Sequence, residues 1–431
     1  MRFQGSPREG LIGATIAFFI GFAAVSLFGP TARKLQDVMG LTPTMVGFLV
    51  AVPSLSGSLL RIPFAAWVDA TGGRKPILVL LAASVIGMAG LTTLMFLLYP
   101  QGMTASIYPL LLILGMLCGC GIAIFSPGIG QVSYWFPQNR QGFALGVYAG
   151  VGNLAPGIFS LLLPVALTAL GLPGSYLVWL IFLVVGAAVY FFSGRNAWYF
   201  QALAQGADPQ RARSLAQAHG QEIFPARSTR ESLILSARVW KTWFLVAIYF
   251  TTFGGFIAMT SWLPTYWTAF FGVSTVAAGV YTAIYSISTS LFRVAGGGVA
   301  DRMGGEKTVQ LALIIMLIGA GGLSLSHRPA LSLAATLMMA LGMGVANAAV
   351  FKLVAKEVPQ AVGGASGWVG GLGAFGGFAL PPILSLFVRL QGQDGYAIGF
   401  LTYVVISLIA LFLALTLSRA HGGTAVALTT R

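Results

Sequence analysis

Charged side chains are scarce in this chain of 431 residues, because only 8% are Asp, Glu, Lys or Arg and only ten are acidic. A soluble domain carries about 25% charged residues, so the composition excludes an ordinary water-soluble protein. Hydrophobic residues make up 57% of the chain, and the mean hydropathy is +0.86. The sequence therefore predicts a protein whose solvent is a lipid bilayer.

Groups for catalysis and metal binding are also few. Two cysteines, Cys118 and Cys120, lie in one apolar segment and point in different directions on a helix, which argues against a disulfide or metal framework. We find no nucleophile–base set, metal-ligand cluster or nucleotide-binding loop, so we expect neither an enzyme nor a cofactor. The net charge of +14 is scattered over short loops without a continuous basic face, which argues against nucleic acid as a partner.

Long apolar runs are what the chain does contain, each of about 20 residues and long enough to cross a hydrocarbon core of roughly 30 Å. We count twelve, centred near residues 20, 56, 87, 121, 155, 183, 255, 285, 317, 342, 375 and 406. One long polar interruption divides them. The sequence therefore predicts an all-α membrane protein with twelve transmembrane helices in two pseudo-symmetric six-helix halves, residues 1–194 and 240–431, joined by a cytoplasmic linker at 195–239.

An internal repeat supports the two halves. The stretch "SLLRIPFAAWVDATGGRKP", which begins at Ser58, returns as "SLFRVAGGGVADRMGGEKT" from Ser290. A constant offset of 232 residues superposes Arg61 on Arg293. It also superposes Asp69 on Asp301, Gly72 on Gly304, and Lys75 on Lys307. Two repeats in the same orientation are the design of a secondary transporter whose site lies at the interface of the halves near mid-membrane.

The distribution of basic residues gives the orientation. Most of the 24 Lys and Arg residues fall near the termini, in the linker or in loops on the same side. The opposite loops hold only Arg33, Lys34, Arg328 and Arg389. By the positive-inside rule, both termini and the linker are predicted to be cytoplasmic.

Arg61 and Arg293 are predicted at membrane depth. Each lies eight residues before the aspartate that opens a cytoplasmic loop, which is about 12 Å along a helix. That depth is close to the middle of the hydrocarbon core, where an arginine stays charged. Either each guanidinium snorkels to the surface or pairs with an acid, or the compensating anion is the substrate.

Pairing with an acid is disfavoured because all ten Asp and Glu residues fall in loops or at helix ends. Two cations on facing halves without a buried anion therefore favour a small anionic substrate. The planar fork of arginine suits a planar oxyanion bound through two oxygens.

The segments that follow the two arginines, "DATGGRKP" and "DRMGGEKT", resemble the loop signature of the major facilitator superfamily. The resemblance implies conformational latches at the cytoplasmic helix ends, formed by Asp69, Arg74 and Lys75 and by Asp301, Arg302 and Lys307. The first copy departs from the pattern at Ala65, where the family has glycine and where the second copy keeps Gly297.

Two glycine-rich segments, "GVYAGVGNLAPG" and "GWVGGLGAFGGF", also repeat, with an offset of 221 residues. They superpose Gly150 on Gly371 and Gly152 on Gly373. Small residues permit close helix packing in membranes, and the same density of glycine lets helices slide during alternating access. Both interpretations stay open.

Paired glycine segments together with one arginine in each half resemble the nitrate/nitrite porter family of the major facilitator superfamily, over all twelve segments. The resemblance implies a planar anion held between two aromatic rings, Phe125 and Phe351, with its oxygens bound by Arg61 and Arg293. It further implies contacts from Tyr249 and Asn153. The expected function is transport of nitrate, nitrite or both across a bacterial inner membrane by a monomer.

The coupling mode stays open at this stage. His219, His327 and His421 all lie in loops or tails, which favours exchange of nitrate for nitrite over transport with protons. Lys352, in "VFKLV", resembles a subgroup thought to co-transport protons. Either it snorkels toward Glu357, or a buried lysine with a lowered pKa serves coupling. A transporter of another small organic or inorganic anion is the alternative function, and an anion channel or a nitrate sensor is a more distant one.

Overall fold

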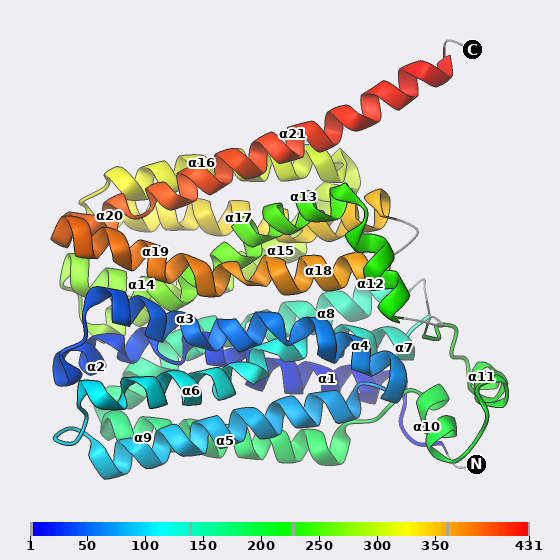
Figure 1. The fold of residues 1–431 in the computed structure, drawn as a ribbon, viewed down its shortest axis with the longest axis horizontal. Coiled ribbons are helices and arrows are strands. Elements are labelled where there is room, and N and C mark those ends of the chain that lie inside the picture. Colours follow the sequence, from blue (N-terminus) through cyan, green and yellow to red (C-terminus); the bar gives the residue numbers. More distant parts are fainter. Residues whose placement is uncertain (1–2, 138–139, 226–228, 359–361, 430–431) are drawn as a thin grey trace.

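The computed structural model describes residues 3–137, 140–225, 229–358 and 362–429, and the regular structure of these residues is entirely helical. The long helices lie side by side along the longest axis of the molecule (Figure 1). The elements of the first part are α1 (Pro7–Phe22), α2 (Ala32–Met39), α3 (Pro43–Leu59), α4 (Arg61–Thr71), α5 (Arg74–Leu98), α6 (Tyr108–Gly119), η4 (Cys120–Ile124), α7 (Phe125–Trp135), α8 (Gln141–Asn153) and α9 (Ala155–Ser193).

Three short helices follow: α10 (Trp198–Ala204), α11 (Pro209–Ala218) and α12 (Thr229–Ala237). The remaining helices are α13 (Trp240–Tyr249), the π-helical turn η6 (Phe250–Gly254), α14 (Gly255–Phe271), α15 (Thr275–Met303), α16 (Gly305–Leu325), α17 (Pro329–Glu357), α18 (Val362–Ala374), α19 (Gly376–Gln391), α20 (Gly395–Ile398) and α21 (Leu401–Thr429). In Figure 1, α1 to α9 fill one side of the molecule and α13 to α21 the other.

Eleven helical stretches among the described residues are long and apolar enough to cross a membrane. One of them, Ala144–Ser193, is 50 residues long, about twice what a single crossing needs. Its continuity is interrupted at Gly171, where φ is 66° and ψ is −176°. Only glycine adopts this backbone conformation readily. Dividing the stretch there gives the twelve predicted spans, so the all-helical membrane fold is confirmed.

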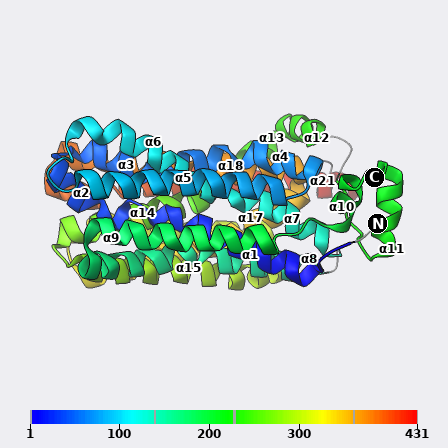
Figure 2. The same ribbon diagram turned by 90° about the horizontal axis from the view of Figure 1, so that it is seen from below.

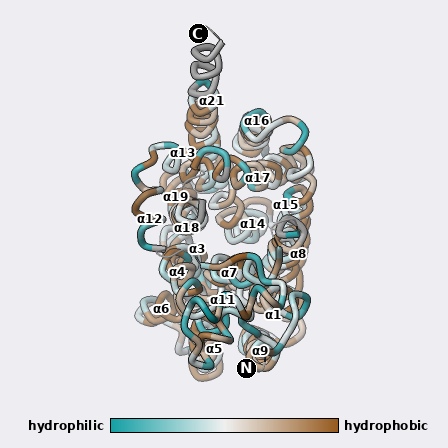
Figure 3. Tube along the Cα trace, turned by 90° about the vertical axis from the view of Figure 1, so that its right-hand side faces the viewer, coloured by the Kyte–Doolittle hydropathy of each residue, from teal (hydrophilic) through white to brown (hydrophobic). Residues whose placement is uncertain are grey.

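The two ends of the bundle differ. Both termini lie at the same end as α10 and α11, whereas α2 and α20 lie at the opposite end (Figures 1 and 2). We call these the linker end and the distal end. Viewed from the linker end, hydrophilic stretches gather in the segments around α11, and the helices behind them are mostly hydrophobic (Figure 3).

The two sides of the molecule touch closely toward the distal end. A Cβ atom added to Gly47 of α3 would lie 2.2 Å from the Ser385 hydroxyl of α19. One added to Gly279 of α15 would lie 2.3 Å from the Ser160 carbonyl oxygen of α9. Real Cβ contacts are longer than this, so glycine alone permits these crossings. The bundle is therefore closed at its distal end.

Candidate anion-binding site

Arg61 lies at the junction of α3 and α4, with its side chain fully buried. Its Nε donates to the Gly57 carbonyl at 3.1 Å, and its Nη1 donates to the Gly370 carbonyl of α18 at 3.0 Å. A third, longer bond runs from Nη2 to the Ile122 carbonyl at 3.5 Å. The guanidinium is thus held in the interior by backbone oxygens from both sides of the molecule, and it does not snorkel.

Arg293 projects from the middle of α15 and is half-buried. Its Nη2 donates to the Tyr249 hydroxyl at 3.4 Å, whereas its Nη1 is buried without a hydrogen-bond partner among the described residues. The ion pairs in the described part of the chain include neither Arg293 nor Arg61. Since a charge in the protein interior is costly without a counter-ion, the two guanidinium groups form a candidate site for an anion.

Two aromatic rings lie against both guanidinium groups. The Cζ of Arg61 is 4.8 Å from the ring centroid of Phe125 and 5.3 Å from that of Phe253. The corresponding distances from Arg293 are 5.9 and 5.4 Å. The two ring centroids are 5.9 Å apart with 29° between their planes. Both cations and both rings therefore converge on one point, and each ring face stabilises the cations.

Phe351, the ring expected opposite Phe125, lines one cavity together with Phe125 and Arg293, and the ring pair stays a prediction. Phe351 of α17 contacts the Tyr249 ring edge-on, with centroids 5.1 Å apart and 84° between the planes. Besides Phe125, Phe253 is the ring that lies against both guanidinium groups. The hydroxyl of Tyr249, a predicted site residue, accepts a hydrogen bond from Arg293.

The glycine-rich segments pack directly behind the rings. A Cβ added to Gly152 would lie 1.9 Å from the ring of Phe18, which in turn contacts the Phe125 ring at a centroid distance of 5.3 Å. A Cβ at Gly371 would lie 2.7 Å from the side chain of Ile62. A Cβ at Gly150 would lie 3.7 Å from its nearest neighbour, an ordinary contact distance. Gly152 and Gly371 therefore allow close packing of the helices next to the site.

Gly373→Ala is expected to lower transport about tenfold without unfolding the protein. A Cβ at this position would lie 2.6 Å from Cδ1 of Tyr249, so the ring must shift and its hydroxyl must leave Arg293. Overpacking of this kind costs about 1–3 kcal/mol. The measurement is the initial rate of anion uptake into vesicles. Gly321→Ala, where a Cβ would meet nothing within 4 Å, is the control and should transport normally. Normal transport by the Gly373 variant would contradict the expectation.

Two cavities adjoin Arg293. A narrow one, too tight for a water molecule, is lined by Arg293, Phe253, Phe256, Asn153, Asn347, Thr289 and Ser290. A larger one of about 550 Å³ is lined by Phe125, Phe351, Arg293 and Asn347 and by small and apolar residues of α7, α8, α15 and α18. Its lining continues from Phe125 to Ile129 and from Arg293 to Gly297, toward the linker end. The larger cavity therefore extends from the rings toward the linker end.

Asn153 lies at the C-terminal end of α8 and is buried. Its carbonyl oxygen accepts a hydrogen bond from the Ser290 hydroxyl at 3.0 Å, which joins α8 to α15 beside Arg293. Its side-chain oxygen has no hydrogen-bond partner within the described ranges. The Asn153 side chain thus lines the narrow cavity, and its oxygen accepts no hydrogen bond from the described residues.

The predicted latch residues of the first repeat contact their own side of the molecule. Asp69 accepts a hydrogen bond from the Tyr134 hydroxyl of α7 at 2.6 Å. The Arg74 guanidinium donates to the Phe191 carbonyl near the end of α9 at 2.7 Å. These contacts fasten the linker ends of α4 and α5 to α7 and α9.

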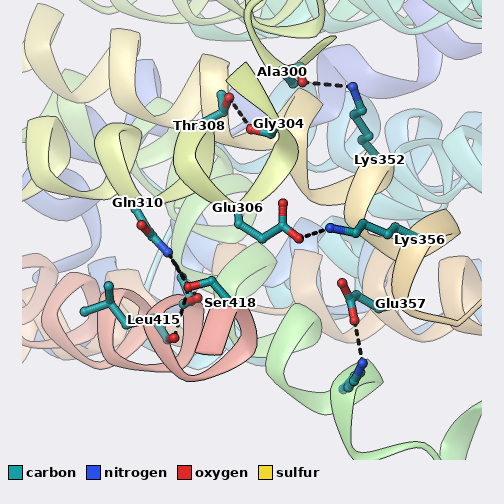
Figure 4. Close-up of polar contacts among 12 residues, drawn as sticks. Ala300, Gly304, Glu306, Thr308, Gln310, Lys352, Lys356, Glu357, Leu415 and Ser418 are labelled. Carbon is teal, nitrogen blue, oxygen red and sulfur yellow. Dashed lines mark hydrogen bonds and ion pairs between the residues drawn. The ribbon is translucent and has the colours of Figure 1, made fainter. Parts of the chain in front are cut away.

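In the second repeat, Lys352 forms an ion pair with Asp301 at 2.7 Å. Its ammonium also donates to the Ala300 carbonyl at 2.8 Å (Figure 4). Asp301 is the third residue from the end of α15, and Lys352 is the sixth residue from the end of α17, so the pair is near the linker end. Glu357, toward which Lys352 would snorkel in one of the two alternatives, forms an ion pair with Lys241. Arg302 is exposed and forms no ion pair within the described ranges.

Lys352→Met is expected to reduce the anion transport that the sequence resemblance implies by less than about fivefold. The Lys352–Asp301 pair is solvent-exposed, and such pairs are worth about 0.2–1 kcal/mol. The measurement is exchange in vesicles at several external pH values. Unchanged pH dependence is expected relative to the unsubstituted chain. A loss of pH-driven uptake with exchange preserved would instead assign Lys352 to proton coupling.

Two residues of the site were missed by the sequence analysis. Phe253 lies one helical turn after Tyr249, and Asn347 lies one turn before Phe351. That i, i+4 spacing puts each on the helix face of a predicted site residue and is the signal that could have found them.

Comparison with known proteins agrees with the geometry. The model of the Major Facilitator Superfamily matches residues 14–381 and 278–429. The probable nitrate/nitrite transporter NarK2 of Mycobacterium tuberculosis is 30% identical over 93% of this chain and 94% of its own. The probable nitrate transporter NarT of Staphylococcus epidermidis is 27% identical over 92% and 94%.

A solved structure supports the fold. The Escherichia coli xylose transporter XylE, in a partially occluded inward open conformation, has a TM-score of 0.74 and 14% identity and covers 96% of this chain and 98% of its own. At this identity the likeness concerns the fold alone. The predicted family is confirmed by the sequence relatives. The chain is a multi-pass membrane transporter that belongs to the Major Facilitator Superfamily and, within it, to the nitrate/nitrite porter family.

Proposed function

We propose that this chain carries nitrate and nitrite across the bacterial inner membrane as a monomer, by alternating access of its two six-helix halves. The observation that carries the proposal is the convergence of two unpaired guanidinium groups and two aromatic rings at the interface of the two sides. The names of the sequence relatives point to the same substrates.

The ring geometry favours a planar anion. Phe125 and Phe253 present their faces from two sides, so a flat ion fits between them when the halves adjust. A tetrahedral ion such as sulfate or phosphate would need more space between the rings. Arg61 and Arg293 supply N–H donors for the oxygens of the anion. Nitrate and nitrite satisfy both requirements.

Alternating access follows from the asymmetry of the two ends. Glycine contacts close the distal end, and the large cavity leads from Arg293 toward the linker end. We propose that the linker end is cytoplasmic, because it carries the termini, the linker and most of the basic residues. Residues 1–194 and 240–431 would then rock about the site, with 195–239 as a linker on the cytoplasmic side.

Exchange is the coupling mode that the site favours. Without an anion, Arg61 and Arg293 would have to move through the membrane interior as two uncompensated charges, which is costly. The carrier should therefore return only when loaded. Lys352 is paired with Asp301 at the linker end, which supports a role as a latch rather than as a proton carrier.

The test is transport by the purified chain in vesicles. Nitrate should enter vesicles loaded with nitrite or nitrate and should not enter empty ones. Uptake by empty vesicles under a pH gradient would favour transport with protons instead. Stronger competition by other small organic or inorganic anions than by nitrate would overturn the proposed substrate in favour of another small anion.

A further inference from the structure

Asn347 lies beside Arg293 because α15 and α17 approach each other at a distance that only glycine permits. A Cβ added to Gly344 would lie 2.5 Å from the Thr289 carbonyl oxygen and 3.0 Å from the backbone nitrogen of Arg293. One added to Gly296 would lie 2.6 Å from the backbone of α17. The two helix backbones therefore touch at the level of Arg293. Asn347 follows Gly344 by three residues, so it lies on the same face of α17, about 4.5 Å further along the helix.

The Asn347 side chain is buried and its polar group is unused. Only 1% of the residue is exposed, and its Oδ1 has no hydrogen-bond partner among the residues that the structure describes. Nη1 of Arg293 and Oδ1 of Asn153 are likewise buried without a hydrogen-bond partner among the described residues. Buried polar atoms are normally satisfied because leaving them unpaired is costly. Three polar side chains, each with an atom that lacks a protein partner among the described residues, therefore line one narrow cavity.

Asn347 also borders both cavities. The narrow cavity contains Asn153 and Phe253, the large one contains Phe125 and Phe351, and Arg293 and Asn347 line both. An anion that passes from the rings to the linker end must therefore pass Asn347 together with Arg293. Nothing in the sequence repeat singles out this asparagine, because the offset that superposes Phe125 on Phe351 places Gly121 on Asn347.

The number of available donors distinguishes nitrate from nitrite. One guanidinium fork binds two oxygens of a planar anion, which satisfies nitrite. Nitrate has a third oxygen that points away from the fork and needs a donor from another helix. Three N–H groups of Arg61 already donate to backbone carbonyls. An asparagine amide offers two N–H donors, and rotation of the amide by 180° brings them where Oδ1 now lies.

We propose that Asn347 is a specificity-determining residue, whose amide donates a hydrogen bond to the third oxygen of nitrate and so favours nitrate over nitrite. This inference rests on the proposed function. A site built to donate a hydrogen bond loses affinity for the ligand that needs it when the donor is removed, and loses little for a ligand that does not.

The experiment compares Asn347→Leu with the unsubstituted chain in two exchange assays, nitrate into nitrate-loaded vesicles and nitrite into nitrite-loaded vesicles. The KM for nitrate should rise about tenfold, the effect of losing one hydrogen bond to a charged group. The KM for nitrite should change by less than about twofold. Asn347→Ser, which keeps a shorter donor, should lie between these values and serves if the leucine variant does not fold.

Thr265→Val is the matched control, because Thr265 is also buried with an unpaired hydroxyl but lines neither cavity. Its ratio of KM values should equal that of the unsubstituted chain. An equal rise of both KM values in the Asn347 variants, or no rise, would overturn the assignment of Asn347. If the unsubstituted chain exchanges neither anion, the proposed function itself fails, which is a separate result.

Discussion

Arg61→Lys is expected to abolish anion exchange, with a loss of at least 100-fold in the initial rate. The guanidinium of Arg61 joins carbonyls from three elements, Gly57 of α3, Ile122 of η4 and Gly370 of α18. A compact ammonium cannot reach all three and cannot bind an anion through a planar fork. A loss of 100-fold corresponds to about 2.8 kcal/mol, within the range for a truncated buried charge contact.

Arg293→Lys should have a similar effect for a different reason. Arg293 donates only one hydrogen bond within the described ranges, to Tyr249, so its fork is free for the anion. The lysine variant should keep its thermal stability while the KM rises steeply. For Arg61→Lys, by contrast, thermal stability should fall as well, because carbonyls of both sides of the molecule lose their donors.

Arg389→Lys is the control for both variants, since Arg389 is exposed in the last turn of α19 at the distal end. It should exchange nitrate at the rate of the unsubstituted chain. Protein content and monodispersity in detergent must match across the set. Near-normal exchange by either the Arg61 or the Arg293 variant would remove the basis of the proposed site.

Phe253→Leu is the second large effect that we expect, with the KM for nitrate raised about 30-fold. Leucine fills part of the volume but has no flat face for the anion. It also removes the ring contacts of both guanidinium groups, at 5.3 and 5.4 Å. Cation–π contacts in a desolvated site are worth about 2 kcal/mol or more, which corresponds to a factor of about 30.

Phe351→Leu provides the comparison that decides which ring faces Phe125. Phe351 meets Tyr249 edge-on and contacts neither guanidinium face, so its substitution should raise the KM by less than about fivefold. Phe412→Leu, which is exposed on α21, should transport normally. A larger effect at Phe351 than at Phe253 would support Phe125 and Phe351 as the ring pair, as the sequence resemblance implied.

Gly373 and Lys352 have different roles, since one packs against a site residue and the other joins two helix ends. Gly373 packs against Tyr249 and so acts on the site, whereas Lys352 and Asp301 fasten two helices at the linker end. We therefore expect Gly373→Ala to change the KM and Lys352→Met to change mainly the rate at saturation. The same exchange assay measures both quantities.

The amino-acid sequence by itself determined the membrane-spanning class, the twelve spans and the paired arginines. Hydrophobic length and charge scarcity are local properties that the bilayer selects directly, and the repeat needed only an alignment of the chain with itself. The positions of the ten acids were enough to leave Arg61 and Arg293 without a predicted counter-ion. The residues Phe125 and Tyr249 followed from the resemblance to a family rather than from their own pattern.

Only the tertiary structure decided which groups meet at the site. Gly370 accepts from Arg61 across 309 residues, and Lys352 meets Asp301 rather than Glu357 because α15 and α17 lie in a particular register. Phe253 is one of 30 phenylalanines, and in the sequence only its spacing of four residues from Tyr249 connects it with the predicted site. Contacts between distant helices depend on crossing positions that glycines set, such as Gly344 against Arg293. Such positions are properties of two surfaces together, which no single segment of the chain encodes.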